Sequence, residues 1–374
     1  MQFIDLKTQQ ERIKPGIDAA IQRVLEHGRY IMGPEIIELE ERLAEYVGAK
    51  HCISCSSGTD ALSLPLMAYG AGPGDAIFTT PFTFFASPES IALTGATPVF
   101  VDIEPDTYNM DPQKLVEAIE EVRTKTDLKP RGVMPIDLFG LPADYDSIMP
   151  IAAEHDMFVL EDGCQAFGAE YKGRKAPGLA DAGATSFFPA KPLGCYGDGG
   201  AVFTNDSELA DKMRSIRVHG QGEDKYNNVR IGLNARMDTI QAAILLEKMK
   251  IYPEEIEMRQ SVAAKYLELL EALGPQSPIS RMPRIPEGYK SVFAQFCIES
   301  DQRAEIQAAL SAADIPSPIY YAKPMHQLDA MQGHSYPPSK SFPVSEQAAE
   351  KIFALPFHPY LKDEDIEKIV DVIG

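Results

Sequence analysis

The residue type and spacing around Lys191 favour amine chemistry. An apolar run, Gly183 to Phe188, is typical of a buried strand, and Pro189 ends it. After the lysine come four glycines within seven residues and then a second apolar run from Ala201. We therefore expect Lys191 on a tight loop between two strands, although a plain solvated lysine is the alternative. Apolar surroundings disfavour the ammonium form and lower the pKa of a lysine, as a Schiff-base-forming amine requires.

Other polar groups are expected near the same place. Asp162 follows the apolar run 157–160, so its carboxylate either caps the next helix or faces a ligand. Small residues in Ser57-Gly58-Thr59 precede an apolar helix and leave backbone N–H groups free, which makes either an anion site or an ordinary helix cap. Phe84 lies on a loop after a strand. Gly28 to Pro34, which contains Tyr30, is a glycine-bracketed loop or a simple turn.

The elements that must position these residues alternate between strand and helix. Alternation at this spacing predicts an α/β fold with a mostly parallel sheet and helices on both faces. Ligands of such sheets bind beyond the carboxyl ends of the strands. The expected strands are 52–56, 76–80, 97–102, 132–138, 157–160, 183–188, 201–204 and 292–298, and the expected helices include 13–25, 34–47, 111–122, 145–154 and 254–273. Pro65 should kink or shorten the helix that follows Thr59.

We expect two domains in the 374 residues. Residues 1–250 form the large domain, with 1–33 contributing to a loop at the substrate, and residues 251–374 form a smaller α/β domain.

Composition narrows the partners and the compartment. The formal net charge of −20 disfavours nucleic acid and anionic membranes as partners. No apolar run is long enough for a membrane span, and the first five residues are not typical of a signal peptide. An odd count of five cysteines favours a reducing, cytoplasmic setting. Cys52 and Cys55 form a C-x-x-C, but the sequence has no second pair or histidine cluster to complete a zinc site, so we expect no metal.

The candidate residues agree on pyridoxal 5′-phosphate as a cofactor. Lys191 would form the Schiff base, and Asp162 would keep the pyridine nitrogen protonated so that the ring draws electrons. Phe84 can stack on the ring. Gly58 and Thr59, together with Ser186, can hold the phosphate.

With these residues in hand, the chain resembles the sugar-nucleotide aminotransferases over its whole length. The resemblance implies a fold type I pyridoxal-phosphate enzyme. The motifs that carry it are Gly33-Pro34, Ser57-Gly58-Thr59-Asp60-Ala61-Leu62, Pro81-Phe82-Thr83-Phe84, Glu161-Asp162 with Gln165, Ser186-Phe187 to Lys191, Gly197-Asp198-Gly199-Gly200 and Asn234-Ala235-Arg236-Met237-Asp238.

The resemblance also implies roles for further residues. Gln165 meets the ring hydroxyl, and Lys191 moves a proton between the substrate carbon and the cofactor. Asn234 reaches the phosphate of a partner subunit, which implies a homodimer with its active site at the interface. The implied substrate contacts are Tyr30, His219, Arg236 and Tyr321.

Within the family the chain looks closest to enzymes that aminate UDP-2-acetamido-2-deoxy-3-oxo-glucuronate. The implied donor is L-glutamate, and the implied role is in surface polysaccharide, such as lipopolysaccharide, biosynthesis. Tyr320-Tyr321-Ala322 departs from the His-Tyr-Pro of that subgroup, which leaves a 4-keto-6-deoxy nucleotide sugar as an alternative acceptor.

Three other functions fit these residues less well. Related dehydratases carry histidine in place of the lysine, so Lys191 speaks against dehydration. A regulatory protein that binds the cofactor without turnover would need a DNA-binding module or basic patch, and none is evident. A nicotinamide oxidoreductase needs G-x-G-x-x-G after its first strand, which Ser56-Ser57-Gly58-Thr59 does not supply.

Overall fold

A seven-stranded sheet forms the centre of the protein in the computed structural model, which describes residues 1–224, 226–337 and 340–374. Only the pairings of β9 with its two neighbours are antiparallel among the pairs of this sheet, so the predicted mostly parallel sheet is confirmed. In spatial order the strands are β1 (His51–Cys55), β9 (Gly200–Thr204), β8 (Ala182–Ser186), β5 (Phe158–Asp162), β4 (Lys129–Val133), β2 (Asp75–Thr79) and β3 (Thr97–Phe100).

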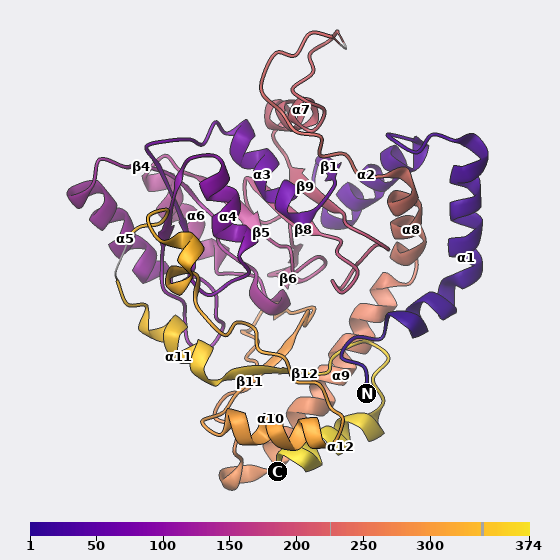
Figure 1. Cartoon of the computed structure of the whole chain (residues 1–374), viewed down its shortest axis with the longest axis vertical. Helices are drawn as coiled ribbons and strands as arrows, with labels where there is room; N and C mark the ends of the chain where they lie inside the picture. Colours follow the sequence, from indigo (N-terminus) through magenta and orange to yellow (C-terminus); the bar gives the residue numbers. More distant parts are fainter. Residues whose placement is uncertain (225, 338–339) are drawn as a thin grey trace.

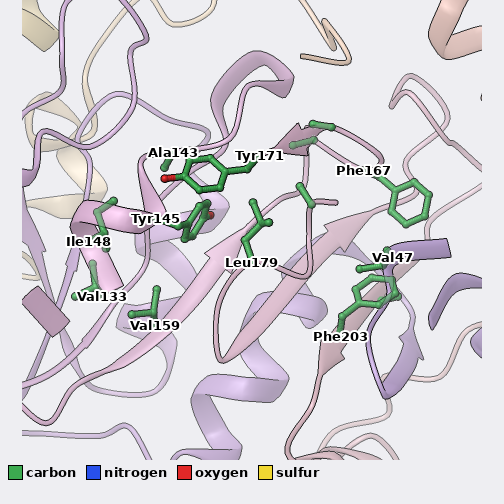
Figure 2. Packing of buried hydrophobic residues seen from close by; sticks show 14 of the residues in the cluster. Val47, Val133, Ala143, Tyr145, Ile148, Val159, Phe167, Tyr171, Leu179 and Phe203 are labelled. Atoms are coloured by element: carbon green, nitrogen blue, oxygen red, sulfur yellow. The ribbon is translucent and has the colours of Figure 1, made fainter. Parts of the chain in front are cut away.

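Helices cover both faces of this sheet (Figure 1). One face packs against α2 (Pro34–Val47), α5 (Pro112–Lys125), α6 (Tyr145–Glu154) and α8 (Thr239–Met249), and the other against α3 (Gly58–Ala68), α4 (Ala86–Leu93) and α7 (Ser207–Ile216). Successive strand residues point to opposite faces, so Phe78 lies in one buried cluster and Ile77 in the other. Figure 2 shows part of the first cluster, in which the rings of Tyr145 and Tyr171 lie next to each other.

The last third of the chain packs around a cluster of its own, at the bottom of Figure 1. This cluster joins α9 (Tyr252–Ala272), α10 (Arg303–Ala312) and α12 (Asp363–Ile373) to the antiparallel pair β11 (Phe296–Glu299) and β12 (Ile352–Leu355). The proposed division at residue 250 stays a prediction. The other short elements are β6 (Glu170–Tyr171), β7 (Arg174–Lys175), β10 (Tyr289–Lys290), α11 (Pro343–Lys351), η1 (Leu138–Gly140), η2 (Gly274–Gln276), η3 (Met325–Gln327) and η4 (Asp329–Met331).

The N-terminal helix α1 (Leu6–His27) is longer than the predicted 13–25. It begins early because the side chain of Asp5 accepts a hydrogen bond from the Thr8 amide at 3.0 Å and so caps the first turn. The helix then packs along α8. In α3 the effect expected of Pro65 is small, because the helix continues to Ala68.

The predicted bounds of two strands are wrong. In place of 132–138, β4 covers Lys129–Val133, and Pro135, which has no amide proton, follows shortly after its end. In place of 292–298, β11 covers Phe296–Glu299. The amides of Val292 and Ala294 instead donate to Gly140 O at 3.0 Å and Phe139 O at 2.8 Å, next to the large sheet.

Cys52 and Cys55 lie on opposite faces of β1, one in each buried cluster. Both thiols are free, and their separation by the sheet means that they cannot ligate one ion together. Among the described residues no group of three or more His, Cys, Asp or Glu is placed to hold a metal. In the same residues no helix combines the length and apolarity needed to cross a membrane.

Candidate active site

Lys191 lies on the loop between β8 and β9, as predicted. Its amide donates to Phe188 O at 2.8 Å, which turns the loop back toward the end of β8. The side chain is partly buried. Burial lowers the pKa of Lys191, and the nearby Cys164 and Asp162 oppose this change only in part. The loop therefore holds an amine that loses its proton more readily than an ordinary lysine.

Asp162 is the last residue of β5 and pairs in register with Ala184 of β8. The residue is 5% exposed. Its Oδ2 accepts a hydrogen bond from Ser87 Oγ at 2.7 Å, and its Oδ1 accepts one from the Cys164 amide at 3.2 Å. The strand that carries this fixed carboxylate thus lies beside the strand that leads to Lys191. A carboxylate in this position can accept a further hydrogen bond from a ligand N–H.

Gln165 and Tyr321 meet beside the end of β5. Gln165 Oε1 accepts a hydrogen bond from the Phe139 amide at 2.7 Å, and its Nε2 donates to the Tyr321 hydroxyl at 3.0 Å. Burial raises the pKa of Tyr321, so its hydroxyl keeps its proton at neutral pH. The Phe84 ring is 6.5 Å from the Tyr321 ring and 59% exposed, so one of its faces remains available to a ligand.

The first turn of α3 meets the end of β8 at a close contact. A Cβ added at Gly58 would lie 2.6 Å from Ser186 Cβ, so only glycine permits this approach. Ser57 Oγ caps the helix by accepting from the Asp60 amide at 3.1 Å. The amides of Gly58 and Thr59 have no acceptor within the described parts of the chain. Two free amides and the Ser186 hydroxyl therefore converge, which is the chemistry of a phosphate site.

The remaining predicted residues are not joined to this group. Tyr30, His219 and Asn234 are exposed, and Arg236 is partly buried. Within residues 1–224, 226–337 and 340–374, no hydrogen bond connects any of them to Lys191. His219 lies at the base of the loop after α7, which projects from the top of the molecule in Figure 1.

An open cleft of about 680 Å³ lies between this projecting loop and α3. Thr59 lines it on the α3 side, and Arg230 and Ile231 line it on the loop side. Ile231 is 86% exposed and Val229 is 53% exposed, so the loop presents apolar side chains to its surroundings. Exposed apolar groups beside a cleft are typical of a surface that another chain covers.

Two residues that position the site were not predicted. Ser87 orients the Asp162 carboxylate from α4. Gln241, at the start of α8, fixes the loop after Lys191, because its Oε1 accepts a hydrogen bond from the Tyr196 amide at 2.9 Å. Neither has a local sequence signal, since each acts on a residue more than forty positions away.

The model of the DegT/DnrJ/EryC1/StrS aminotransferase family matches residues 11–374. The chain is 49% identical over 369 residues to "UDP-2-acetamido-2-deoxy-3-oxo-D-glucuronate aminotransferase" of Pseudomonas aeruginosa, covering 99% of this chain and 98% of the relative. It is 40% identical over 372 residues to "Pleiotropic regulatory protein" of Geobacillus stearothermophilus, covering 100% of this chain and 97% of the relative.

Among solved structures, a DegT/DnrJ/EryC1/StrS aminotransferase from Brucella abortus has a TM-score of 0.96. It is 49% identical in sequence, and the match covers 100% of this chain and 98% of the other.

Proposed function

Because the chain belongs to the DegT/DnrJ/EryC1/StrS aminotransferase family, we propose that it transfers an amino group from L-glutamate to UDP-2-acetamido-2-deoxy-3-oxo-glucuronate. The chain is a pyridoxal 5′-phosphate-dependent aminotransferase that acts on nucleotide sugars. The choice of sugar is supported by the Pseudomonas aeruginosa relative, which matches almost the whole chain. The donor, and a role in surface polysaccharide biosynthesis such as that of lipopolysaccharide, are part of the proposal.

The residues of the site suit the cofactor. Its phosphate fits the two free amides of α3 and the Ser186 hydroxyl, where Gly58 leaves room for them. Its ring nitrogen suits the Asp162 carboxylate, its ring hydroxyl suits Gln165, and its ring face suits the exposed side of Phe84. When bound, the group supplies an electron-withdrawing ring that stabilises negative charge on the carbon that loses its proton.

Lys191 carries the reaction in this proposal. Burial lowers its pKa, so Nζ gives up its proton and becomes a base more readily than an ordinary lysine does. In this role Nζ would take the proton from the α-carbon of the amino donor and return it to the carbon on the other side of the transferred nitrogen. In the second half of the reaction it would move a proton in the reverse direction, onto the sugar carbon that receives the nitrogen. Ser87 keeps Asp162 oriented throughout, because its hydroxyl donates to Oδ2 at 2.7 Å.

The enzyme is proposed to work as a homodimer with its active sites at the interface. The support is the position of His219 and Asn234, which are exposed and not joined to the Lys191 group of their own chain. The apolar residues Val229 and Ile231 on the same loop favour contact with a second copy. In such a dimer Asn234 would reach the partner's phosphate site, and Tyr30, His219, Arg236 and Tyr321 would contact the sugar nucleotide.

A cytoplasmic location is also proposed, because all five cysteines are free thiols. Free thiols are typical of a reducing compartment. Nucleotide sugars and glutamate are both soluble anions, which suits a protein without a membrane helix among the residues described.

A second candidate function is regulation without turnover. The Geobacillus stearothermophilus relative is named a pleiotropic regulatory protein, and it matches the whole of this chain. The two functions differ in one observable, because only an aminotransferase consumes a donor.

The test is the visible absorption of the purified protein loaded with pyridoxal 5′-phosphate. We expect L-glutamate to remove the visible band, and the keto sugar nucleotide to restore it. Lys191→Ala should lack both responses, whereas Lys368→Ala, which changes an exposed lysine of α12, should retain them. A protein that never binds the cofactor, or a Lys191→Ala protein that responds like the wild type, would refute the proposal. Binding without any response to a donor would support regulation instead.

A further inference from the structure

Two acidic side chains, Asp137 and Glu161, are fully buried beside Asp162. Both are 0% exposed. Glu161 is the neighbour of Asp162 on β5, and the Asp137 amide donates to Asp162 O at 3.0 Å. Asp162 in turn donates its amide to Pro135 O at 2.9 Å. The two acids therefore flank the backbone of the residue proposed to meet the cofactor ring.

The hydrogen bonds of this pair are incomplete if both acids are ionised. Asp137 Oδ1 accepts from the Ala143 amide at 2.9 Å and from the Tyr145 hydroxyl at 2.8 Å. Glu161 Oε2 accepts from the Leu179 amide at 2.7 Å. The other two oxygens, Asp137 Oδ2 and Glu161 Oε1, are buried and have no donor among the described residues. Two such oxygens would each carry the cost of an unpaired buried acceptor.

Ile136, next to Asp137, pairs with Asp162 in a parallel bridge. The side chains of Asp137 and Glu161 therefore point to the same face of the sheet, and each carboxyl group shifts the pKa of the other. No lysine, arginine or histidine in the described parts of the chain forms an ion pair with either. Two carboxylates in contact and out of water repel strongly. A single proton between them removes the repulsion and satisfies both unpaired oxygens at once. Since Asp137 already accepts two hydrogen bonds, it is the carboxylate, and Glu161 Oε1–H is the donor.

We propose that Asp137 and Glu161 share one proton, and that this bond holds Asp162 in place as the ionised partner of the cofactor. The two acids are positioning residues, and this role rests on the proposed function of Asp162. Backbone hydrogen bonds hold Asp162 between Pro135 O and the Asp137 amide, but Pro135 itself has no amide proton to donate to the sheet. The side-chain bond joins the two segments at that point. It also leaves one negative charge beside Asp162 instead of two.

The charged and titratable groups around the pair favour a retained proton. Tyr145 faces it from α6, and Asp162 lies next to it on β5. Burial raises the pKa of Asp137 to about 7 and raises that of Glu161 well above its ordinary value. The folded state therefore binds more protons than the unfolded state above the ordinary carboxyl range. The contribution of this pair to the free energy of unfolding is therefore largest in acid. It declines as the pH rises from the ordinary carboxyl pKa range through about 7.

The shared proton can be tested without the cofactor. In infrared spectra of cofactor-free protein at mildly alkaline pH, we expect the carbonyl stretch of a buried carboxylic acid. Glu161→Gln should abolish it, because Asp137 is then a carboxylate that accepts from the glutamine amide. Glu350→Gln, at an exposed position on α11, should not change it. Absence of the acid band from the wild type, or its persistence in Glu161→Gln, would overturn the proposal.

The second measurement is the dissociation constant of pyridoxal 5′-phosphate. Glu161→Leu leaves Asp137 Oδ2 unpaired beside Asp162 and should weaken binding at least about tenfold. Glu161→Gln restores a donor and should recover most of the affinity. Equal affinity in the wild type and Glu161→Leu would overturn the positioning role and leave the proposed function standing. If the wild type shows the acid band but does not turn over glutamate, the proposed function is refuted and the shared proton is not.

Discussion

Replacing Ser87 removes a hydrogen bond that orients the Asp162 carboxylate. Among the residues that the structure describes, the Ser87 hydroxyl and the Cys164 amide are the donors to that group. In Ser87→Ala the carboxylate is free to rotate away from the ring nitrogen. We expect kcat to fall about three- to tenfold with a small change in KM, since a single hydrogen bond contributes roughly 1 kcal/mol. Steady-state kinetics with L-glutamate measures this.

Ser90→Ala is the matched control for Ser87→Ala. Ser90 lies on the same helix and is equally buried, but its hydroxyl donates to Ser87 O at 2.9 Å and does not touch Asp162. Equal losses in the two variants would mean that α4 is merely disturbed, and no loss in Ser87→Ala would remove Ser87 from the site.

The local sequence identified the residues that carry distinctive chemistry, but it missed the residues that position them through hydrogen bonds. Lys191 and Asp162 stand out because a lysine among glycines and an acid at a strand end are unusual. Gln165 was added by family resemblance, and the structure joins it to Tyr321, 156 positions away. No local sequence pattern identifies Ser87, because a serine in a short helix can orient Asp162 only once the fold has placed that helix against the end of β5.

At the scale of elements, the close contact between α3 and β8 defines the proposed phosphate site. Gly58→Ala would place a methyl group 2.6 Å from Ser186 Cβ and push the helix end away from the strand. We expect cofactor affinity to fall at least about tenfold, because the amides and the hydroxyl no longer converge. Equilibrium dialysis with pyridoxal 5′-phosphate measures the change.

Gly72→Ala provides the comparison for Gly58→Ala. At Gly72 the nearest atom to an added Cβ is Thr94 O at 3.9 Å, so the methyl group fits without displacement. Affinity in this variant should match the wild type. If Gly58→Ala binds equally well, the first turn of α3 does not hold the phosphate.

The order of elements was predictable where periodicity was strong, and their ends were not. The bounds of β4 and β11 depend on contacts distant in the sequence. The backbone of Val292 and Ala294 bonds to residues 139 and 140 instead of extending β11, and no local pattern reveals this choice. The start of α1 at Leu6 depends on its Asp5 cap, which lies eight residues before Ile13, the first position of the predicted apolar periodicity. The ends of the two strands are thus decided by tertiary packing, and the start of α1 by a local cap.

At the scale of the whole molecule, the first residues of the chain contact the segment that precedes α12, and this segment carries a buried histidine. The Phe357 amide donates to Phe3 O at 3.1 Å, and His358 is 5% exposed. Burial lowers the pKa of His358 to about 4. The unfolded chain therefore binds an extra proton between about pH 6.5 and 4, and stability falls as the pH falls through this window.

The expected loss in acid from His358 is up to about 3 kcal/mol at pH 4. Urea unfolding between pH 7.5 and about 4 should show a shallower decline in His358→Gln than in the wild type. His334→Gln, at an exposed position, should follow the wild-type curve. Parallel curves for all three proteins would show that His358 is not the group responsible.

The proposed dimer predicts that two inactive variants restore each other. If Asn234 serves the site of the partner, a mixed dimer of Lys191→Ala and Asn234→Ala contains one site with both native residues. Random mixing after subunit exchange should then give about a quarter of the wild-type activity. Each variant alone should be nearly inactive. Differently tagged chains, co-purified on both tags, verify that mixed dimers have formed.

Lys191→Ala mixed with Asp162→Ala is the control, because both residues belong to the site of their own chain. One site of that mixed dimer lacks the lysine and the other lacks the carboxylate, so no activity should return. Recovery in the first mixture alone locates Asn234 in the partner's site. If mixed dimers form and the first mixture stays inactive, Asn234 acts within its own chain. The projecting loop with Val229 and Ile231 then has another purpose than completing a neighbouring site.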